Sequence, residues 1–190
     1  MNNDLFQGKL VHLKAVDTQV MAEAFSRWAQ DSEYWRLLAS DPSHSFSVKS
    51  TKEWLEKEQS KDPPGFYMFA IHTLDDDKLI GEIGLDAVEL PHLETFVGIG
   101  LGERETWGKG FGTDAMRIIL RYAFTELNLH RVSLTVFEYN PRAIQSYIKA
   151  GFVEEGRVRG FLHRAGRRYD LIFMGILREE WEKIYGYNSS

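Results

Sequence analysis

Three glycines that alternate with other residues, Gly108, Gly110 and Gly112, form the pattern in this sequence that points most directly to chemistry. They lie in the stretch E-T-W-G-K-G-F-G-T-D-A, residues 105–115, between a strand-like run and a helix-like run. Glycine is favoured where the backbone turns sharply or approaches a ligand without an intervening side chain. At the start of a helix, such a loop directs free N–H groups and the positive end of the helix dipole to one point. The pattern therefore predicts a binding site for a phosphate or a diphosphate.

A second pattern, N-P-R-A-I-Q-S-Y-I-K-A-G-F at residues 140–152, places an amide and a phenol on one helical stripe. Asn140, Ala143 and Tyr147 follow one another at offsets of 0, 3 and 7, which a helix brings onto the same side. Asn140 also has a purely structural interpretation as a helix N-cap, and Tyr147 has one as a core residue with its hydroxyl at the edge. These alternatives remain open on the pattern alone.

The glycine loop can also be compared with two other phosphate-binding patterns. Residues 110–115 read G-x-G-x-x-A, as in a dinucleotide-binding turn, with Glu138 as the acid that binds the ribose. Two spacings disagree, because eight residues separate Leu101 from Gly110, and Glu138 lies 28 positions beyond Gly110 where about 20 is usual. No G-x-x-x-x-G-K-[ST] phosphate loop occurs. A nicotinamide-dependent oxidoreductase is therefore the weaker alternative.

Length and composition favour one soluble globular domain. The chain has 190 residues, 43% hydrophobic residues and a net charge of −5, with no long basic stretch, so nucleic acid is not an expected partner. No apolar run approaches the roughly 20 residues that span a bilayer, and the N-terminus does not resemble a secretory signal. We therefore expect no membrane partner and a cytoplasmic location.

Cysteine and histidine limit the chemistry further. The chain has no cysteine, which excludes disulfides, thiolate metal sites and a cysteine nucleophile. Its six histidines show no metal-ligand spacing, so the sequence predicts no metal.

The elements that must position these residues follow from hydrophobic periodicity and turn signals. The strands are predicted at about 9–15, 66–72, 79–85, 94–101, 131–137, 152–162 and 168–177. The helices are predicted after Asp17 and at about 31–38, 50–59, 113–126 and 140–150, with a short one near the C-terminus. The main order β-α-α-β-β-β-α-β-α-β-β indicates one α+β domain over 1–190, with a core at about 8–178 and a short polar tail.

Taken together, the two motifs resemble the GNAT superfamily of acyl-coenzyme A-dependent N-acetyltransferases. The resemblance rests on W-G-K-G-F-G-T-D-A, then a helix, a strand and N-P-R-A-I-Q-S-Y-I-K-A-G-F, about thirty residues apart. The tail G-R-R-Y-D-L-I-F-M-G-I-L-R-E-E-W is similar to the branch that contains ribosomal-protein N-terminal and polyamine acetyltransferases. The family implies a central, mostly antiparallel, twisted sheet of about seven strands flanked by about four helices.

The resemblance also implies acetyl-CoA as the co-substrate, no metal, and a set of roles for individual residues. The strand that precedes the loop would splay from its neighbour, and its backbone would pair with the pantetheine arm. Asn140 would bind the cofactor or orient the substrate, and Tyr147 would lie near the coenzyme sulfur. The cofactor-binding residues implied in this way are Gly100, Leu101, Gly102, Trp107, Gly108, Lys109, Gly110, Phe111, Gly112, Thr113, Asn140, Ala143 and Tyr147.

This chain departs from the family at two places. Trp107 stands where the loop usually begins with Gln or Arg, although a backbone cradle does not depend on that side chain. Phe96 and Val97 occupy the middle of a strand in which many relatives carry a glutamate. The identity of the general base is therefore open, and Glu82 and Glu94 are the candidates.

Acetyl transfer to an amine sets three chemical requirements. The ammonium, with a pKa of ~10.4, must lose a proton before it can attack, and a carboxylate reached through water can accept that proton. Backbone N–H groups of the splayed strand can stabilise the oxygen on which charge develops. Tyr147, with an ordinary pKa of ~10, can protonate the leaving thiolate. Without cysteine, we expect direct attack in a ternary complex, with Tyr147, Asn140 and Glu82 as the catalytic residues.

The acceptor site is expected to come from the first helices and the last hairpin. Its aromatic candidates are Trp28, Tyr34, Trp35, Trp54 and Phe161, and its acidic candidates are Asp31, Glu33 and Asp41. The acids would attract a cationic amine such as a polyamine or a basic N-terminus, so the partner is a small-molecule or peptide amine. A non-catalytic acyl-CoA-binding module is the alternative on the same fold. The sequence leaves the oligomeric state open, with a homodimer as one candidate.

Overall fold

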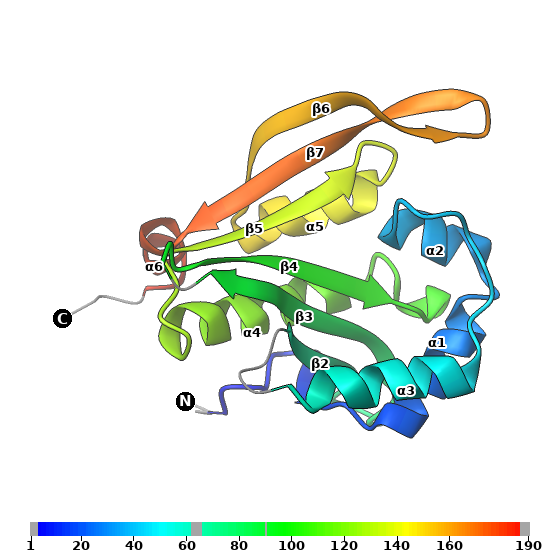
Figure 1. Ribbon diagram of the computed structural model, residues 1–190. Coiled ribbons are helices and arrows are strands. Elements are labelled where there is room, and N and C mark those ends of the chain that lie inside the picture. Colours follow the sequence, from blue (N-terminus) through cyan, green and yellow to red (C-terminus); the bar gives the residue numbers. More distant parts are fainter. Residues whose placement is uncertain (1–3, 62–65, 90, 187–190) are drawn as a thin grey trace.

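A seven-stranded sheet runs through the molecule in the order β1-β2-β3-β4-β5-β7-β6 (Figure 1). The structure is a computed structural model that describes residues 4–61, 66–89 and 91–186. The strands are β1 Val11–Ala15, β2 Phe66–Thr73, β3 Leu79–Glu89, β4 Glu94–Leu101, β5 Arg131–Phe137, β6 Val153–Arg164 and β7 Arg167–Leu177. Neighbouring strands are antiparallel except for the parallel pair β4 and β5, which confirms the mixed, mostly antiparallel sheet.

Helices cover both faces of this sheet. They are α1 Thr18–Trp28, α2 Ser32–Leu38, α3 Val48–Gln59, α4 Phe111–Thr125, α5 Pro141–Ala150 and α6 Arg178–Tyr185. The described residues thus form six helices rather than about four, because the short α2 and α6 add to the four main ones. Helices α1–α3 share one hydrophobic cluster with β2, whereas α4 and α5 pack on the opposite face in the larger core.

Periodicity and caps explain where the helices begin. In α4, Met116, Ile119, Leu120 and Ala123 are buried, as their helical spacing predicts. Asp17 caps α1 by accepting from two backbone N–H groups.

Two predicted helix starts were wrong by two residues. Helix α3 begins at Val48 with Ser47 as its cap, whereas its start was predicted at about residue 50. Helix α4 begins at Phe111 instead of residue 113, because Gly110 is already its N-cap.

Candidate active site

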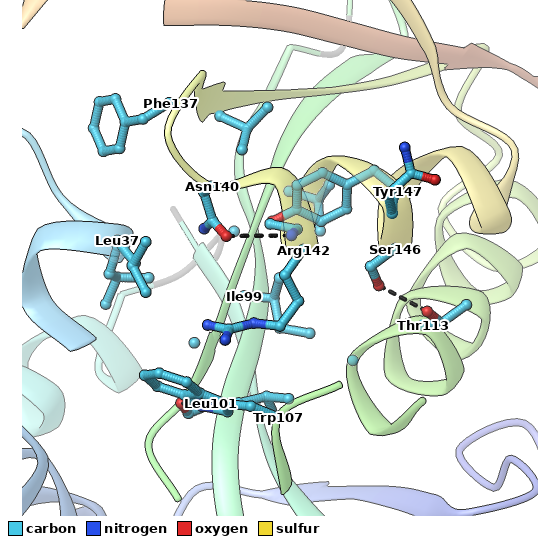
Figure 2. Close-up of a pocket in the computed structure, with 18 of the residues that line it drawn as sticks. Leu37, Ile99, Leu101, Trp107, Thr113, Phe137, Asn140, Arg142, Ser146 and Tyr147 are labelled. Atoms are coloured by element: carbon cyan, nitrogen blue, oxygen red, sulfur yellow. Dashed lines mark hydrogen bonds between the residues drawn. The ribbon is translucent and has the colours of Figure 1, made fainter. Parts of the chain in front are cut away.

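A cleft opens where β4 and β5 separate. The two strands pair only from Glu94 with Arg131 to Phe96 with Ser133, after which no ladder joins them. The gap continues into a cavity of about 540 Å³ between the ends of these strands, helix α2 and helix α5. Figure 2 shows residues of α5 facing β4 across this cavity. The splayed strands expected from the sequence are therefore present.

Of the three residues predicted to offer peptide groups to the cleft, Gly100, Leu101 and Gly102, Leu101 alone does so. The N–H of Gly102 donates to the carbonyl of Ile80 on β3 at 2.9 Å. Since hydrogen bonds to one neighbour alternate along an antiparallel strand, Gly100 also bonds toward β3, while Ile99 and Leu101 face the open side. Gly100 and Gly102 therefore do not offer their peptide groups to a pantetheine arm. Ile99, which the sequence analysis missed, offers both its N–H and its carbonyl.

Trp107 closes one side of the cleft in place of the usual Gln or Arg. Its indole N–H donates to the Leu101 carbonyl at 2.7 Å, which leaves the N–H of Leu101 as that residue's open peptide group. The guanidinium of Arg142 lies over the indole ring, 4.1 Å from its centroid. Arg142 and Lys149, both on α5, line the cleft, so the cavity carries cationic side chains as well as backbone donors.

The glycine loop has the conformation of an anion cradle. Gly108 and Gly110 have φ angles of 75° and 94°, in the left-handed region that favours glycine. Helix α4 starts directly afterwards, so its first N–H groups have no partner within the helix. Within this loop, the residues that line the cleft are Trp107, Gly108, Gly110, Gly112 and Thr113. Phe111 packs against the core, so it can contribute only backbone groups, and the exposed Lys109 is not part of the cleft lining.

Asp114 fixes this loop to the start of the chain. One carboxylate oxygen, Oδ2, accepts hydrogen bonds from the backbone N–H groups of Lys9, Leu10 and Val11, at 2.8, 2.7 and 3.2 Å. The carboxylate lies in the first turn of α4, where the helix dipole also favours a negative charge. The hydrogen bonds of Asp114 therefore anchor the first turn of α4, directly after the glycine loop, to the backbone of residues 9–11.

Asn140, Ala143 and Tyr147 all line the cleft, as the helical stripe predicts. The side-chain oxygen of Asn140 caps α5 by accepting from the N–H of Ala143 at 3.2 Å, and its NH2 group can still donate to a ligand. The ring of Tyr147 packs edge-on against Phe152, with 6.1 Å between centroids. Burial, with a smaller effect from the charge of Glu82, raises the pKa of Tyr147 to about 12. The phenol therefore keeps its proton at neutral pH.

Glu82 lies directly behind β4, on the side of the sheet that α2 covers. It pairs with Gly100 in the β3–β4 ladder. A Cβ atom built on Gly100 would lie 2.7 Å from Oε1 of Glu82 and 2.8 Å from the hydroxyl of Tyr34. Gly100 thus makes room for both side chains. Burial raises the pKa of Glu82 to about 8, and the buried Tyr34 hydroxyl has no hydrogen-bond partner among the described residues.

Glu94, the other candidate base, lies at the closed end of the cleft. It is the first residue of β4 and pairs with Arg131, where the two strands still form a ladder. Glu82 lies toward the open end instead, because it pairs with Gly100, six residues further along β4, and Tyr147 lines the cleft. The geometry therefore favours Glu82.

The raised pKa of Glu82 makes stability depend on pH. A glutamate with a pKa of 4.5 when unfolded and about 8 when folded binds the extra proton in the folded state. Its folded state is therefore most favoured below pH 4.5, and that advantage disappears as pH rises through 8. Between pH 5 and 9 we expect a loss on the order of 4 kcal/mol in the free energy of unfolding. Urea denaturation should show this loss in the native chain and not in Glu82→Gln, and equal slopes in both would contradict it.

Two of the three acidic residues predicted to attract the acceptor, Asp31 and Glu33, already form ion pairs. Arg104 pairs with Asp31 and with Glu33, and its hydrogen bonds lower the pKa of Asp31. Asp31 also caps α2, and Asp41 is exposed outside the cleft lining. The acid that does line the cleft is Asp86 on β3, which the sequence analysis missed.

Of the predicted aromatic residues, Tyr34 lines the cleft. Trp28 is buried in the α1–α3 cluster, and Trp35 packs against Phe46 with 4.7 Å between centroids. Trp54 and Phe161 are exposed and do not belong to the lining. The other four predicted aromatic residues therefore lie in packed clusters or on the surface, outside the cleft lining.

These features fit coenzyme A in three respects. The cleft offers unpaired strand peptides, a left-handed glycine turn at a helix start, and cations for phosphate groups. Residues 10–153 match the family of the Acetyltransferase (GNAT) domain, which is three quarters of the chain.

The chain belongs to the GNAT family.

Two bacterial relatives agree with this assignment. The chain is 31% identical over 141 residues to the N-acetyltransferase YokL of Bacillus subtilis, covering 74% of this chain and 76% of YokL. It is 29% identical over 172 residues to YdaF of the same organism, named as a candidate ribosomal N-acetyltransferase, covering 90% and 91%. Acetyl-CoA-dependent transfer to an amine is thus the activity of this GNAT chain, and the dinucleotide interpretation of the loop is excluded.

A solved structure extends the agreement to three dimensions. The spermidine N-acetyltransferase of Vibrio cholerae, crystallised with CoA and spermine, superposes with a TM-score of 0.79 at 25% identity, covering 90% of this chain and 97% of that one. The fold of this GNAT chain is thereby confirmed. Among its described residues, no helix is long and apolar enough to cross a bilayer.

Proposed function

We propose that this GNAT enzyme transfers an acetyl group from acetyl-CoA to a primary amine of a polyamine. The proposal rests on which residues lie on each of the two faces of β4. On the α4–α5 side lie the glycine loop and Tyr147. On the α2 side Asp86 lines the cleft, and Glu82 is buried directly behind Gly100. The donor and the acceptor would therefore approach the same strand from opposite faces.

The donor side would hold the coenzyme through backbone groups. The amides at residues 107–113 would bind the diphosphate, and the open peptide groups of Ile99 and Leu101 would pair with the pantetheine arm. Arg142 and Lys149 would add charge toward the phosphates. When bound, the thioester supplies an activated acetyl group. The N–H groups of the splayed strand would stabilise the negative charge that develops on the carbonyl oxygen.

Two proton transfers would accompany the exchange of the C–S bond for a C–N bond. Glu82, as a carboxylate, would accept the ammonium proton, directly or through water, and the phenol of Tyr147 would donate its proton to the departing thiolate. The two groups are linked, because the charge of Glu82 helps to raise the pKa of Tyr147. Once Glu82 is protonated that contribution disappears, and Tyr147 becomes the stronger acid when the thiolate leaves.

Asp86 supports a polyamine in particular. It lies four residues from Glu82 along β3, so both side chains point to the same face, about 13 Å apart along the strand. Phe96 is the β4 partner of Asp86 and is 45% exposed, and both Phe96 and Leu37 of α2 line the cleft. A chain of methylene groups could lie on these apolar side chains, with one amine at Glu82 and a second ammonium at Asp86. The spermidine enzyme that this fold resembles is consistent with such an acceptor.

Asp86→Asn tests this assignment by comparing acceptors. We expect the KM for spermidine to rise about 10-fold or more, because the second ammonium loses its charged partner. The KM for a monoamine of similar length and the KM for acetyl-CoA should remain as in the native enzyme. Release of free thiol, measured across polyamines, monoamines and peptides with basic N-termini, gives all three values. A preference for peptides, or equal losses for monoamine and polyamine, would exclude the polyamine assignment.

A further inference from the structure

Three potential metal ligands, His12, His72 and Asp77, lie close together at the β1–β2 edge of the sheet, away from the cleft. The imidazole Nε2 of His12 lies 2.8 Å from Oδ1 of Asp77, and the imidazole Nδ1 of His72 lies 3.4 Å from the same oxygen. Nδ1 of His72 also lies 2.9 Å from the backbone carbonyl of Asp77, a hydrogen bond that metal binding would replace. The three ligand atoms all lie within 4.8 Å of one another. They belong to β1, β2 and the turn after β2, and β3 separates these strands from β4.

Strand register creates this cluster from residues that are distant in sequence. His12 of β1 and His72 of β2 are direct antiparallel partners, and their rings lie 5.9 Å apart. Their neighbours Val11 and Ile71 are fully buried, so alternation turns both imidazoles to the other face. Sequence spacing gave no sign of this pair, since sixty residues separate the two histidines and only the fold aligns them.

The turn positions the carboxylate of Asp77 toward both imidazoles. Asp77 has a φ angle of 57°, and Thr73 holds the turn by donating to the Asp76 carboxylate and accepting from the N–H of Lys78 at 2.9 Å. Lys14 donates to Oδ2 of Asp77 at 2.7 Å, which leaves Oδ1 for the histidines. Hydrogen bonds from Lys14 and from His12 lower the pKa of Asp77. The acidic turn is therefore organised and not merely solvated.

We propose that His12, His72 and Asp77 bind a divalent transition-metal ion such as Zn²⁺, with water in the fourth position. Ligands of tetrahedral zinc lie about 3.3 Å apart, given bonds of ~2.0–2.1 Å. The two distances to Oδ1 of Asp77 are 2.8 and 3.4 Å, and all three ligand atoms lie within 4.8 Å of one another, so small side-chain rotations would bring them to one ion. Two imidazoles and one carboxylate select zinc, cobalt or nickel over Mg²⁺ and Ca²⁺, which prefer all-oxygen sites. Each ligand comes from a different element, so the ion would join β1, β2 and the β2–β3 turn.

Titration of the tag-free, metal-stripped chain with ZnCl₂ tests the site. Calorimetry should find one equivalent of tight binding, and Co²⁺ should give the visible absorption of a tetrahedral complex. At a zinc concentration 100-fold above the Kd, the unfolding midpoint should rise by about 5–10 °C. The variants His12→Asn, His72→Asn and Asp77→Asn should each weaken zinc binding at least 10-fold.

Two exposed histidines elsewhere provide matched controls. His130→Asn and His163→Asn remove imidazoles outside the cluster and should leave the zinc affinity unchanged. Unfolding in the presence of EDTA shows whether each variant is folded before its affinity is compared. The proposal fails if the native chain binds zinc no more tightly than a His12→Asn/His72→Asn double variant, or if the control variants lose affinity equally. Acetyl transfer need not change, so this result is independent of the proposed acceptor.

Discussion

Tyr147→Phe should lower kcat by about 100-fold or more while leaving the affinity for acetyl-CoA unchanged. The phenol is the group proposed to protonate the departing thiolate, and removing a general acid typically costs 10²–10⁴-fold. The ring itself would remain packed against Phe152, so the cleft keeps its shape. The initial rate of thiol release at saturating substrate gives kcat, and calorimetry gives the dissociation constant of acetyl-CoA.

Two other tyrosines make this result specific. Tyr185→Phe removes a hydroxyl that donates to the Ala150 carbonyl at the far end of α5, and it should turn over normally. Tyr34→Phe removes the second phenol of the cleft, which lies beside Glu82. If Tyr34→Phe carried the 100-fold loss and Tyr147→Phe did not, the acid would be Tyr34 and the proposed role of Tyr147 would be wrong.

Gly110→Val should weaken acetyl-CoA binding by at least 100-fold. Gly110 has a φ angle of 94°, which a β-branched residue adopts only at a cost of about 1–3 kcal/mol. Relief of that strain would rotate the peptide groups that precede α4 and disperse the donors proposed to bind the diphosphate. Calorimetry with acetyl-CoA and with free coenzyme A measures the loss.

Gly166→Val is the matched control for backbone strain. Gly166 has a φ angle of 77° in the β6–β7 turn, and no atom lies within 4 Å of a Cβ built there. The substitution should cost similar stability without changing affinity for the coenzyme. Retained affinity in Gly110→Val would place the diphosphate elsewhere, and equal losses in both variants would indicate a general effect of destabilisation.

Local patterns in the sequence predicted the fold and much of the candidate site. The glycine loop and the Asn140–Tyr147 stripe are each contained in one short segment, so periodicity and turn chemistry were enough to find them. The cleft that contains them also depends on the splay of β4 from β5, which the family resemblance implied. Glu82 was predicted too, although only the structure gives its burial.

Features that depend on strand register or on distant pairs could not be predicted in this way. Whether Ile99 or Gly100 faces the cleft depends on which residues of β3 bond to β4, and a shift of one residue reverses the answer. The ion pair of Arg104 with Asp31 joins residues 73 positions apart. The sequence therefore gave no sign that Asp31 and Glu33 are paired and not available to attract an amine. Asp86 gave no signal, since one carboxylate in a strand usually faces solvent.

Gly98 and Gly100 of β4, and Gly102 directly after it, differ in what lies behind them. A side chain on Gly102 would collide with Trp28, and one on Gly100 would collide with Glu82 and Tyr34. At Gly98, no atom lies within 4 Å of an added Cβ, yet this residue also lines the cleft. A side chain at Gly98 would therefore project into the cleft without displacing its neighbours, and on the proposed acceptor side it would narrow the range of amines that fit. The same position gives protein engineers a natural entry point for retuning selectivity.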